Sequence, residues 1–267
     1  MNALMLEEYM RLKLVEMPVP EIGPDDVLVR VRACGICGSD VHGIDGSTGR
    51  RLPPIVMGHE AAGIVERTGA NVTDLQPGDR VTFDSTIYCG RCFYCARGEV
   101  NLCDNRMVLG VSPGEYRRHG AFADFVAVPR RIVYHLPDNL SFEQAALIEA
   151  AAVAVHGVGL TPIKLGDSAV VIGSGMIGVL VLQALRAAGC AGVTVIDPVE
   201  SRLKMATDLG ATAVRTFAAD VKDADVVLEC VGSNDSVNAA IGCVRKGGFV
   251  TWWAISSRAW KSRSRPW

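Results

Sequence analysis

Hydrophobic residues follow two different patterns along this chain, and the pattern changes near residue 140. Before that point, short runs rich in β-branched residues alternate with glycine and proline, at residues 27–31, 63–66, 80–83 and 125–128. Apolar runs of this length, bounded by turn residues, are typical of strands. The first part of the chain is therefore expected to be mostly β, in the form of a small barrel.

The second part begins with a predicted helix start. Ser141 is a candidate N-cap with Gln144 three residues later, and an alanine-rich stretch continues to about residue 156. After Ser168, apolar runs at 169–172, 193–196, 213–214, 226–228 and 249–250 alternate with helical stretches at 176–188 and up to about 209. Such alternation predicts a parallel α/β sheet of about five strands.

A glycine-rich turn joins the first of these strands to its helix. Residues 173–178 read Gly-Ser-Gly-Met-Ile-Gly, and Asp197 ends the next strand. In this context the glycines admit a pyrophosphate to a helix N-terminus, and the carboxylate accepts hydrogen bonds from an adenosine ribose. Because Asp197 would repel a 2′-phosphate, NAD is favoured over NADP. Arg202 is either a solvated helix charge or a guanidinium beside the adenine. The cofactor-binding candidates are Gly173, Gly175, Ile177, Gly178, Asp197 and Arg202.

Composition narrows the class of protein. The chain has 267 residues, 49% of them hydrophobic, and 27 basic against 29 acidic residues. This is a globular composition, and its balance of charge offers nucleic acid no attraction. The first thirteen residues do not show the basic start and apolar core of a signal peptide, and the apolar stretch 169–182 is interrupted by glycine and short for a bilayer. We expect a cytoplasmic protein without a membrane partner, whose nine cysteines are more suited to metal than to disulfides.

Four of the cysteines lie within fifteen residues. Cys89, Cys92, Cys95 and Cys103 are spaced so that one loop can wrap a tetrahedral ion. Four-thiolate sites are closed to substrate, so a structural zinc is predicted. An iron–sulfur cluster, disulfides and a zinc ribbon for nucleic acid are the alternatives.

A second set of candidate ligands is dispersed. It consists of Cys37, the pair His59 and Glu60, and Glu149. A mixed set of thiolate, imidazole and carboxylate suits a zinc ion with one position open for water or substrate. Each residue also has a purely structural interpretation: Cys37 as a small buried residue, His59 as a hydrogen-bonded core histidine, and either glutamate as a surface acid.

Several motifs together resemble one family. They are 35–42 (Gly-Ile-Cys-Gly-Ser-Asp-Val-His), 58–60 (Gly-His-Glu), 77–81 (Pro-Gly-Asp-Arg-Val), the four-cysteine loop, Ile148 and Glu149 with Val155 and His156, the glycine turn, and 225–232 (Asp-Val-Val-Leu-Glu-Cys-Val-Gly). In residues 1 to about 250 the chain resembles the zinc-dependent medium-chain alcohol dehydrogenases, most closely the sorbitol and related polyol dehydrogenases. The resemblance implies a GroES-like zinc-binding catalytic domain over 1–145 and a doubly wound Rossmann NAD-binding domain over 146–255.

The resemblance also implies a mechanism. Cys37, His59 and Glu60 would hold the catalytic zinc, Glu149 would ligate it or hold its water, and Cys34 would not be a ligand. Asp40 would orient a zinc ligand, Ser39 would take the proton from the alcohol, His42 would pass it on, and hydride would move to NAD. Two departures concern the substrate: Gly43 stands where the sorbitol enzymes carry an aromatic residue, and Ala150 replaces proline. Threonine and sugar-phosphate dehydrogenases, which share the zinc motif, are alternatives.

The end of the chain departs from this family. All four tryptophans lie in the last sixteen residues, together with four basic residues and no acid. Relatives continue for about eighty residues more and complete both domains. We therefore expect a truncated chain with an aberrant tail over 256–267, which makes the family's homo-oligomer doubtful and leaves an inactive zinc-binding product as an alternative. Codons for Trp252, Trp253 and Ala254, read one base earlier, encode an apolar residue, valine and glycine, so we hypothesise a frameshift near codon 251.

Overall fold

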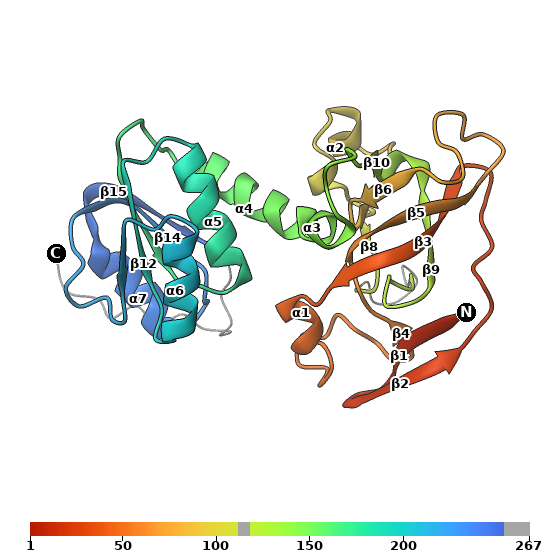
Figure 1. Ribbon diagram of the computed structural model, residues 1–267, viewed down its shortest axis with the longest axis horizontal. Coiled ribbons are helices and arrows are strands. Elements are labelled where there is room, and N and C mark those ends of the chain that lie inside the picture. Colours follow the sequence, from red (N-terminus) through yellow and green to blue (C-terminus); the bar gives the residue numbers. More distant parts are fainter. Residues whose placement is uncertain (112–117, 254–267) are drawn as a thin grey trace. The chain divides into compact units, whose positions relative to one another are not determined.

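The computed structural model describes residues 1–111 and 118–253 (Figure 1). Two compact units make up the chain, Met1–Glu149 and Ala150–Trp267. Their border lies in the first turn of helix α4 (Ile148–Leu160), close to the domain boundary expected after residue 145. The expected aberrant tail, residues 256–267, lies outside the described residues.

The first unit is built from antiparallel strands. One sheet has the order β2-β1-β4, a second has the order β10-β6-β5-β3-β9, and β7 and β8 form a separate pair. An isolated bridge joins Ala3 to Ala123. The strands are β1 (Asn2–Glu8), β2 (Arg11–Glu16), β3 (Asp26–Gly35), β4 (Ile55–Val56), β5 (Glu60–Thr68), β6 (Arg80–Phe83), β7 (Thr86–Ile87), β8 (Met107–Val108), β9 (Phe125–Pro129) and β10 (Val133–His135).

Short helices occupy the connections of this unit. They are α1 (Gly38–Val41), α2 (Phe93–Ala96), η1 (Val100–Leu102), η3 (Arg130–Ile132) and α3 (Phe142–Ala146). The predicted start of α3 is confirmed: Ser141 accepts a hydrogen bond from the backbone of Gln144, whose side chain in turn accepts one from the Ser141 N–H. This reciprocal cap satisfies two N–H groups that the first helical turn leaves free.

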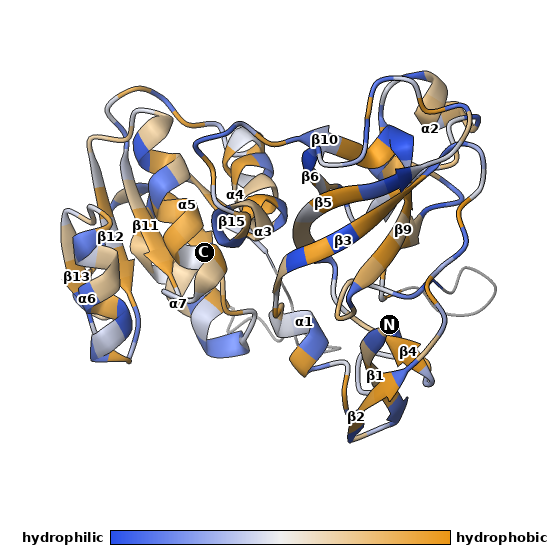
Figure 2. Ribbon diagram, turned by 45° about the vertical axis from the view of Figure 1, so that its right-hand side comes forward, coloured by the Kyte–Doolittle hydropathy of each residue, from blue (hydrophilic) through white to orange (hydrophobic). Residues whose placement is uncertain are grey.

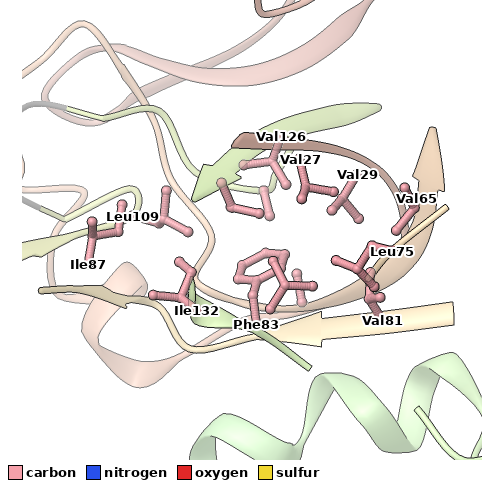
Figure 3. Packing of buried hydrophobic residues seen from close by; sticks show 14 residues of the cluster. Val27, Val29, Val65, Leu75, Val81, Phe83, Ile87, Leu109, Val126 and Ile132 are labelled. Atoms are coloured by element: carbon pink, nitrogen blue, oxygen red, sulfur yellow. The ribbon is translucent and has the colours of Figure 1, made fainter. Parts of the chain in front are cut away.

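The core of the first unit lies between its strands (Figure 3). Val27 and Val29 on β3 pair with Val128 and Val126 on β9, so that alternate residues of both strands point inward. Phe83 on β6 points toward these valines. All four runs predicted as strands lie in strands. Residues 2–16, for which no strand is predicted, form β1 and β2.

The second unit contains the predicted parallel sheet. Its five strands are parallel throughout and run in the order β13-β12-β11-β14-β15. The strands are β11 (Ser168–Ile172), β12 (Gly192–Ile196), β13 (Ala213–Arg215), β14 (Ala224–Glu229) and β15 (Val244–Trp252), and the helices are α5 (Met176–Ala187), α6 (Glu200–Asp208) and α7 (Asn234–Cys243), besides α4. The chain order reverses beside β11, which is where doubly wound sheets bind nucleotides.

Both faces of this sheet are covered. On one face Val171 packs with residues of α4, α5 and α6, and on the other Val170 packs with Ala240 and Cys243 of α7. Figure 2 shows apolar residues along the strands of this sheet and on the helices against it. Near-continuous apolar strands are expected where a parallel sheet is buried on two sides. None of the described helices is long and apolar enough to cross a membrane.

Candidate functional site

The dispersed candidate ligands come together at the start of α1 and the start of β5. Cys37 is the N-cap of α1, and His59 directly precedes Glu60, the first residue of β5. The ligand atoms of Cys37, His59 and Glu60 lie within 4.8 Å of one another. Gly58, at φ +92°, has no room for a side chain, because a Cβ there would lie 2.7 Å from the backbone nitrogen of Phe122. The turn at Gly58 thus positions two consecutive candidate ligands, His59 and Glu60.

This cluster is buried and incompletely hydrogen-bonded. His59 and Glu60 are 6% and 2% exposed. Four buried side-chain polar atoms lack a hydrogen-bond partner in the described part of the chain, and two of them are Nδ1 of His59 and Oε2 of Glu60. Unsatisfied buried groups are costly, and at a functional site they point to a missing ligand. The donor set and these atoms therefore fit a zinc ion with three protein ligands and an open position.

The electrostatics of the cluster also favour a cation. Burial opposes a charge on His59, but the nearby side chains of Asp40 and Cys37 outweigh it and raise the pKa of the imidazole to about 10. Burial raises the pKa of the Glu60 carboxyl, which His59 partly offsets. The surroundings thus hold a proton on His59 where a metal ion would supply the positive charge.

Asp40 links the cluster to an arginine that the sequence analysis missed. Oδ2 of Asp40 accepts a hydrogen bond from the Cys37 N–H at 3.2 Å, and Oδ1 lies 3.5 Å from Nδ1 of His59. Nη2 of Arg51 donates to Oδ1 of Asp40 at 2.9 Å and to Oγ of Ser39 at 3.0 Å. Burial raises the pKa of Asp40, but His59 and Arg51 together lower it. No motif distinguishes Arg51 from the adjacent Arg50.

The remaining predicted residues of this site lie around it. Glu149, in the first turn of α4, is outside the three-residue cluster, and Oε1 of its carboxylate accepts a hydrogen bond from Oγ of Ser85 at 3.3 Å. Burial raises the pKa of Glu149, and the charge of His59 lowers it. Ser39 lies on α1, and His42 is its exposed C-cap. Ser85 had no recognisable sequence signal.

Cys34 behaves differently from Cys37 although only two residues separate them. Burial, with a smaller contribution from Asp40, raises the pKa of Cys34 to about 12. Its thiol donates to the carbonyl of Gly35 at 3.6 Å. Among the residues that the structure describes, Cys34 belongs to neither group of possible metal ligands.

The four-cysteine loop forms a second cluster. The sulfur atoms of Cys89, Cys92, Cys95 and Cys103 all lie within 4.8 Å of one another and are not joined as disulfides. Backbone N–H groups, first that of Arg91, lower the pKa of Cys89 to about 6, whereas desolvation and the neighbouring thiols raise that of Cys95 to about 11. Four converging thiols of this kind fit a closed tetrahedral zinc site.

The glycine turn sits at the end of β11. Gly173 has φ +93°, and Gly178 packs so closely on the carbonyl of Gly173 that no side chain fits between them. Gly175 is the N-cap of α5, with open space where a Cβ would be, and Ile177 lies in the first turn of that helix. The turn therefore has a backbone that a phosphate can approach, beside a helix N-terminus.

Asp197 lies beside this turn, directly after β12. It is 3% exposed, and its carboxylate accepts hydrogen bonds from the N–H groups of Ser174 at 2.7 Å and Val199 at 2.9 Å. Nη1 of Arg202 is 3.7 Å from Oδ2 of Asp197, with over half of the Arg202 side chain exposed. Glu229, which was not predicted as a site residue, ends β14 fully buried and accepts from the N–H groups of Val231 and Gly232.

Comparison with known proteins places the chain in a family. Residues 23–138 match the alcohol dehydrogenase GroES-like domain, and 177–261 match the zinc-binding dehydrogenase model. An uncharacterized zinc-type alcohol dehydrogenase-like protein of Escherichia coli is 38% identical, over 90% of this chain and 72% of its own. Sorbitol dehydrogenase of Bacillus subtilis is 33% identical, over 93% and 73%.

A solved structure agrees with both matches. A putative zinc-binding dehydrogenase from Sinorhizobium meliloti, bound to NADP, superposes with a TM-score of 0.90 at 36% identity and covers 99% of this chain and 80% of its own. The four-cysteine loop lies inside the GroES-like match. The chain belongs to the zinc-dependent medium-chain alcohol dehydrogenases of polyol type, which are oxidoreductases that use zinc and a nicotinamide dinucleotide.

Proposed function

We propose that this chain oxidises a polyol or secondary alcohol with NAD at the cluster of Cys37, His59 and Glu60. One observation carries the proposal: the ligand atoms of these three residues converge within 4.8 Å, and Oε2 of Glu60 is buried without a hydrogen bond among the residues that the structure describes. Cys37, His59 and Glu60 hold the catalytic zinc, and Glu149 is either a fourth ligand or the residue that holds a water molecule there. Zinc supplies a Lewis acid that lowers the pKa of the substrate hydroxyl.

Ser39 and His42 carry the proton away from the substrate. Oγ of Ser39 accepts one hydrogen bond from Arg51, which leaves its second lone pair for the substrate hydroxyl and its own hydrogen for transfer onward. His42 lies at the end of the same short helix and is exposed to solvent, where it can release the proton. Asp40 holds the imidazole of His59 and the backbone of Cys37 in place.

The coenzyme binds at the glycine turn of the second unit. Gly173, Gly175, Ile177 and Gly178 shape the turn for the pyrophosphate, and Asp197 accepts from the adenosine ribose. The buried carboxylate of Asp197 opposes a 2′-phosphate, which supports NAD as the coenzyme. Arg202, which is mostly exposed and 3.7 Å from Asp197, is assigned to the adenosine end of the coenzyme site. We assign the catalytic role to residues 1–145 and the coenzyme to 146–255.

The four-cysteine loop is assigned a structural zinc, so the protein holds two zinc ions per chain. Its free thiols suit a reducing cytoplasm. We also propose a small-molecule substrate as the principal partner.

Steady-state kinetics test the proposal. NADH formation is measured with sorbitol, xylitol, butanediol and threonine, and with NADP in place of NAD, on protein whose zinc content is known. Activity with a polyol and NAD is expected, together with its loss in His59→Ala. His135→Ala is the matched control, because His135 is exposed and its ring contacts the carbonyl of Asp74, away from the proposed zinc ligands. A His59→Ala protein as active as the native chain would contradict the assignment.

A further inference from the structure

Arg51 is the largest side chain that the described part of the molecule buries completely. The whole residue is 1% exposed, although it lies in the loop between α1 and β4. Arginine is almost never fully buried unless it is paired, because removing its charge from water is costly. Arg50, the residue before it, is exposed. Position in a surface loop therefore does not explain why Arg51 is buried.

The guanidinium of Arg51 contacts two residues of the proposed reaction. Its Nη2 donates to the Asp40 carboxylate at 2.9 Å and to the Ser39 hydroxyl at 3.0 Å. The ion pair with Asp40 is almost dry, since both side chains are 2% exposed. Among the residues that the structure describes, Nε of Arg51 has no hydrogen-bond partner. A buried arginine with an unsatisfied nitrogen costs stability, so the contact is a candidate for a functional rather than a stabilising role.

Asp40 connects Arg51 to two of the three proposed zinc ligands, Cys37 and His59. Its other oxygen accepts from the backbone N–H of Cys37, and the oxygen bound by Arg51 is also the one 3.5 Å from Nδ1 of His59. Arg51 thus fixes the carboxylate that faces both ligands. Groups that hold metal ligands from behind set the direction of the ligand atoms and tune affinity for the ion.

The charges give a second reason for a cation at this position. The carboxylate of Asp40 is buried and needs a cationic partner, and Arg51 supplies one directly at 2.9 Å. Buried charges persist only when they are paired in this way.

Gly43 leaves the space that Arg51 occupies. A Cβ at this buried glycine would lie 2.8 Å from Nε of Arg51 and 3.0 Å from the carbonyl oxygen of Ser39, and would also meet Cδ of Arg51. The backbone of Gly43 is not in the left-handed region, so space is the reason for glycine here. A side chain at position 43 and a buried arginine at position 51 exclude one another.

We propose that Arg51 is a positioning residue of the catalytic zinc site: it holds Asp40, and through it His59 and Cys37, while orienting the proton-accepting hydroxyl of Ser39. Gly43 is the residue that makes this placement possible. The inference rests on the proposed function and extends it to two residues that touch neither the ion nor the substrate.

The test compares full-length Arg51→Gln, Arg51→Lys and Gly43→Ala with Arg50→Gln as the matched control. Zinc per chain is measured after dialysis against a chelator, and the visible spectrum is recorded after replacement by cobalt. In Arg51→Gln, affinity for the catalytic zinc is expected to fall by about 10- to 100-fold. The decrease in kcat is expected to be larger than the change in KM. Arg51→Lys keeps the positive charge but lacks the planar set of guanidinium donors, and Gly43→Ala displaces the guanidinium. For both variants we expect zinc affinity and kcat between those of the native chain and of Arg51→Gln.

Two results would overturn the inference. One is an Arg51→Gln protein that keeps both zinc ions, the native cobalt spectrum and native kinetics. The other is loss of the four-cysteine zinc together with a general fall in melting temperature, which would make Arg51 a folding residue. Failure of the proposed function looks different, because the native chain itself would then lack the second zinc or polyol activity.

Discussion

The two cysteine-containing clusters reach similar compactness by opposite routes. The sulfur atoms of Cys89, Cys92, Cys95 and Cys103 converge from one loop of fifteen residues. The cluster of Cys37, His59 and Glu60 converges from a helix N-cap and a strand start more than twenty residues away. Residue spacing alone was enough to predict the first cluster, whereas the second depends on the packing of the whole unit.

The clusters also differ in what surrounds them. Backbone N–H groups of the loop itself lower the pKa of Cys89, so its thiolate is stabilised locally. At the other cluster, the side chain of Asp40 raises the pKa of His59, and Arg51 from a third segment holds Asp40. The local site is thus stabilised by its own loop, whereas the dispersed site depends on surrounding residues such as Asp40 and Arg51 to hold its ligands in place.

The largest expected effect comes from breaking the dispersed cluster alone. Cys37→Ser should reduce kcat/KM by about 10³-fold or more, which corresponds to roughly 4 kcal/mol of transition-state stabilisation. Metal analysis should then find one zinc per chain. Cys34→Ser is the control, since its thiol is neutral and outside the cluster. Two zinc ions in the Cys37→Ser protein would refute the ligand assignment.

Breaking the local cluster should affect stability before chemistry. Cys103→Ser removes a buried sulfur of the four-cysteine loop, and the zinc bound there should be lost. We expect the free energy of unfolding to fall by about 3 kcal/mol or more, because metal binding is coupled to folding of the loop. Urea unfolding measures the loss, with Cys190→Ser as the control. Native stability in Cys103→Ser would show that the loop folds without metal.

An effect of intermediate size is expected in the second unit, where Asp197 is proposed to bind the coenzyme. Asp197→Ala should raise KM for NAD by about 10- to 100-fold, the loss expected for a charged hydrogen bond to the ribose. The Ser174 and Val199 N–H groups would also lose their acceptor. Asp208→Ala is the control, because Asp208 pairs only with exposed Lys204 in the described structure. An unchanged KM for NAD, or equal effects in both variants, would contradict the coenzyme assignment.

The smallest effect concerns the pH dependence of a contact at the N-terminal ends of the strands of the parallel sheet. Arg245 and Ser168 hold the pKa of the Asp225 carboxyl well below its usual range, joining the starts of β11 and β14. A depressed pKa means that the stabilisation is present above the unfolded-state pKa, near about 3.9, and is lost as the pH falls below it.

Urea unfolding at pH 7 and at pH 3 checks this expectation. The stability difference between the native chain and Asp225→Asn should be largest at pH 7 and shrink toward pH 3. Asp208→Asn, which disrupts a pair within one helix, should show a smaller difference. A difference for Asp225→Asn that grows on acidification would reverse the assigned sign.

Much of the fold could be predicted because its signals are local. The capping box of Ser141 and Gln144, the apolar strands of the parallel sheet and the turn after β11 each depend on neighbouring residues. β1 and β2 were not predicted, since β2 is mostly exposed and half polar, and its strand exists through pairing with β1. Periodicity cannot report a strand that partners alone stabilise.

The amino-acid sequence by itself determined the four-cysteine loop and the glycine turn, because in each case the interacting groups are close along the chain. The family resemblance had already grouped Cys37 with His59 and Glu60. Only the tertiary structure decided that Glu149 lies outside their cluster and contacts Ser85, and that Arg51 rather than Arg50 is buried on Asp40. The physical reason is that burial and pairing of charges depend on which distant segments pack together, and residue spacing carries no record of that.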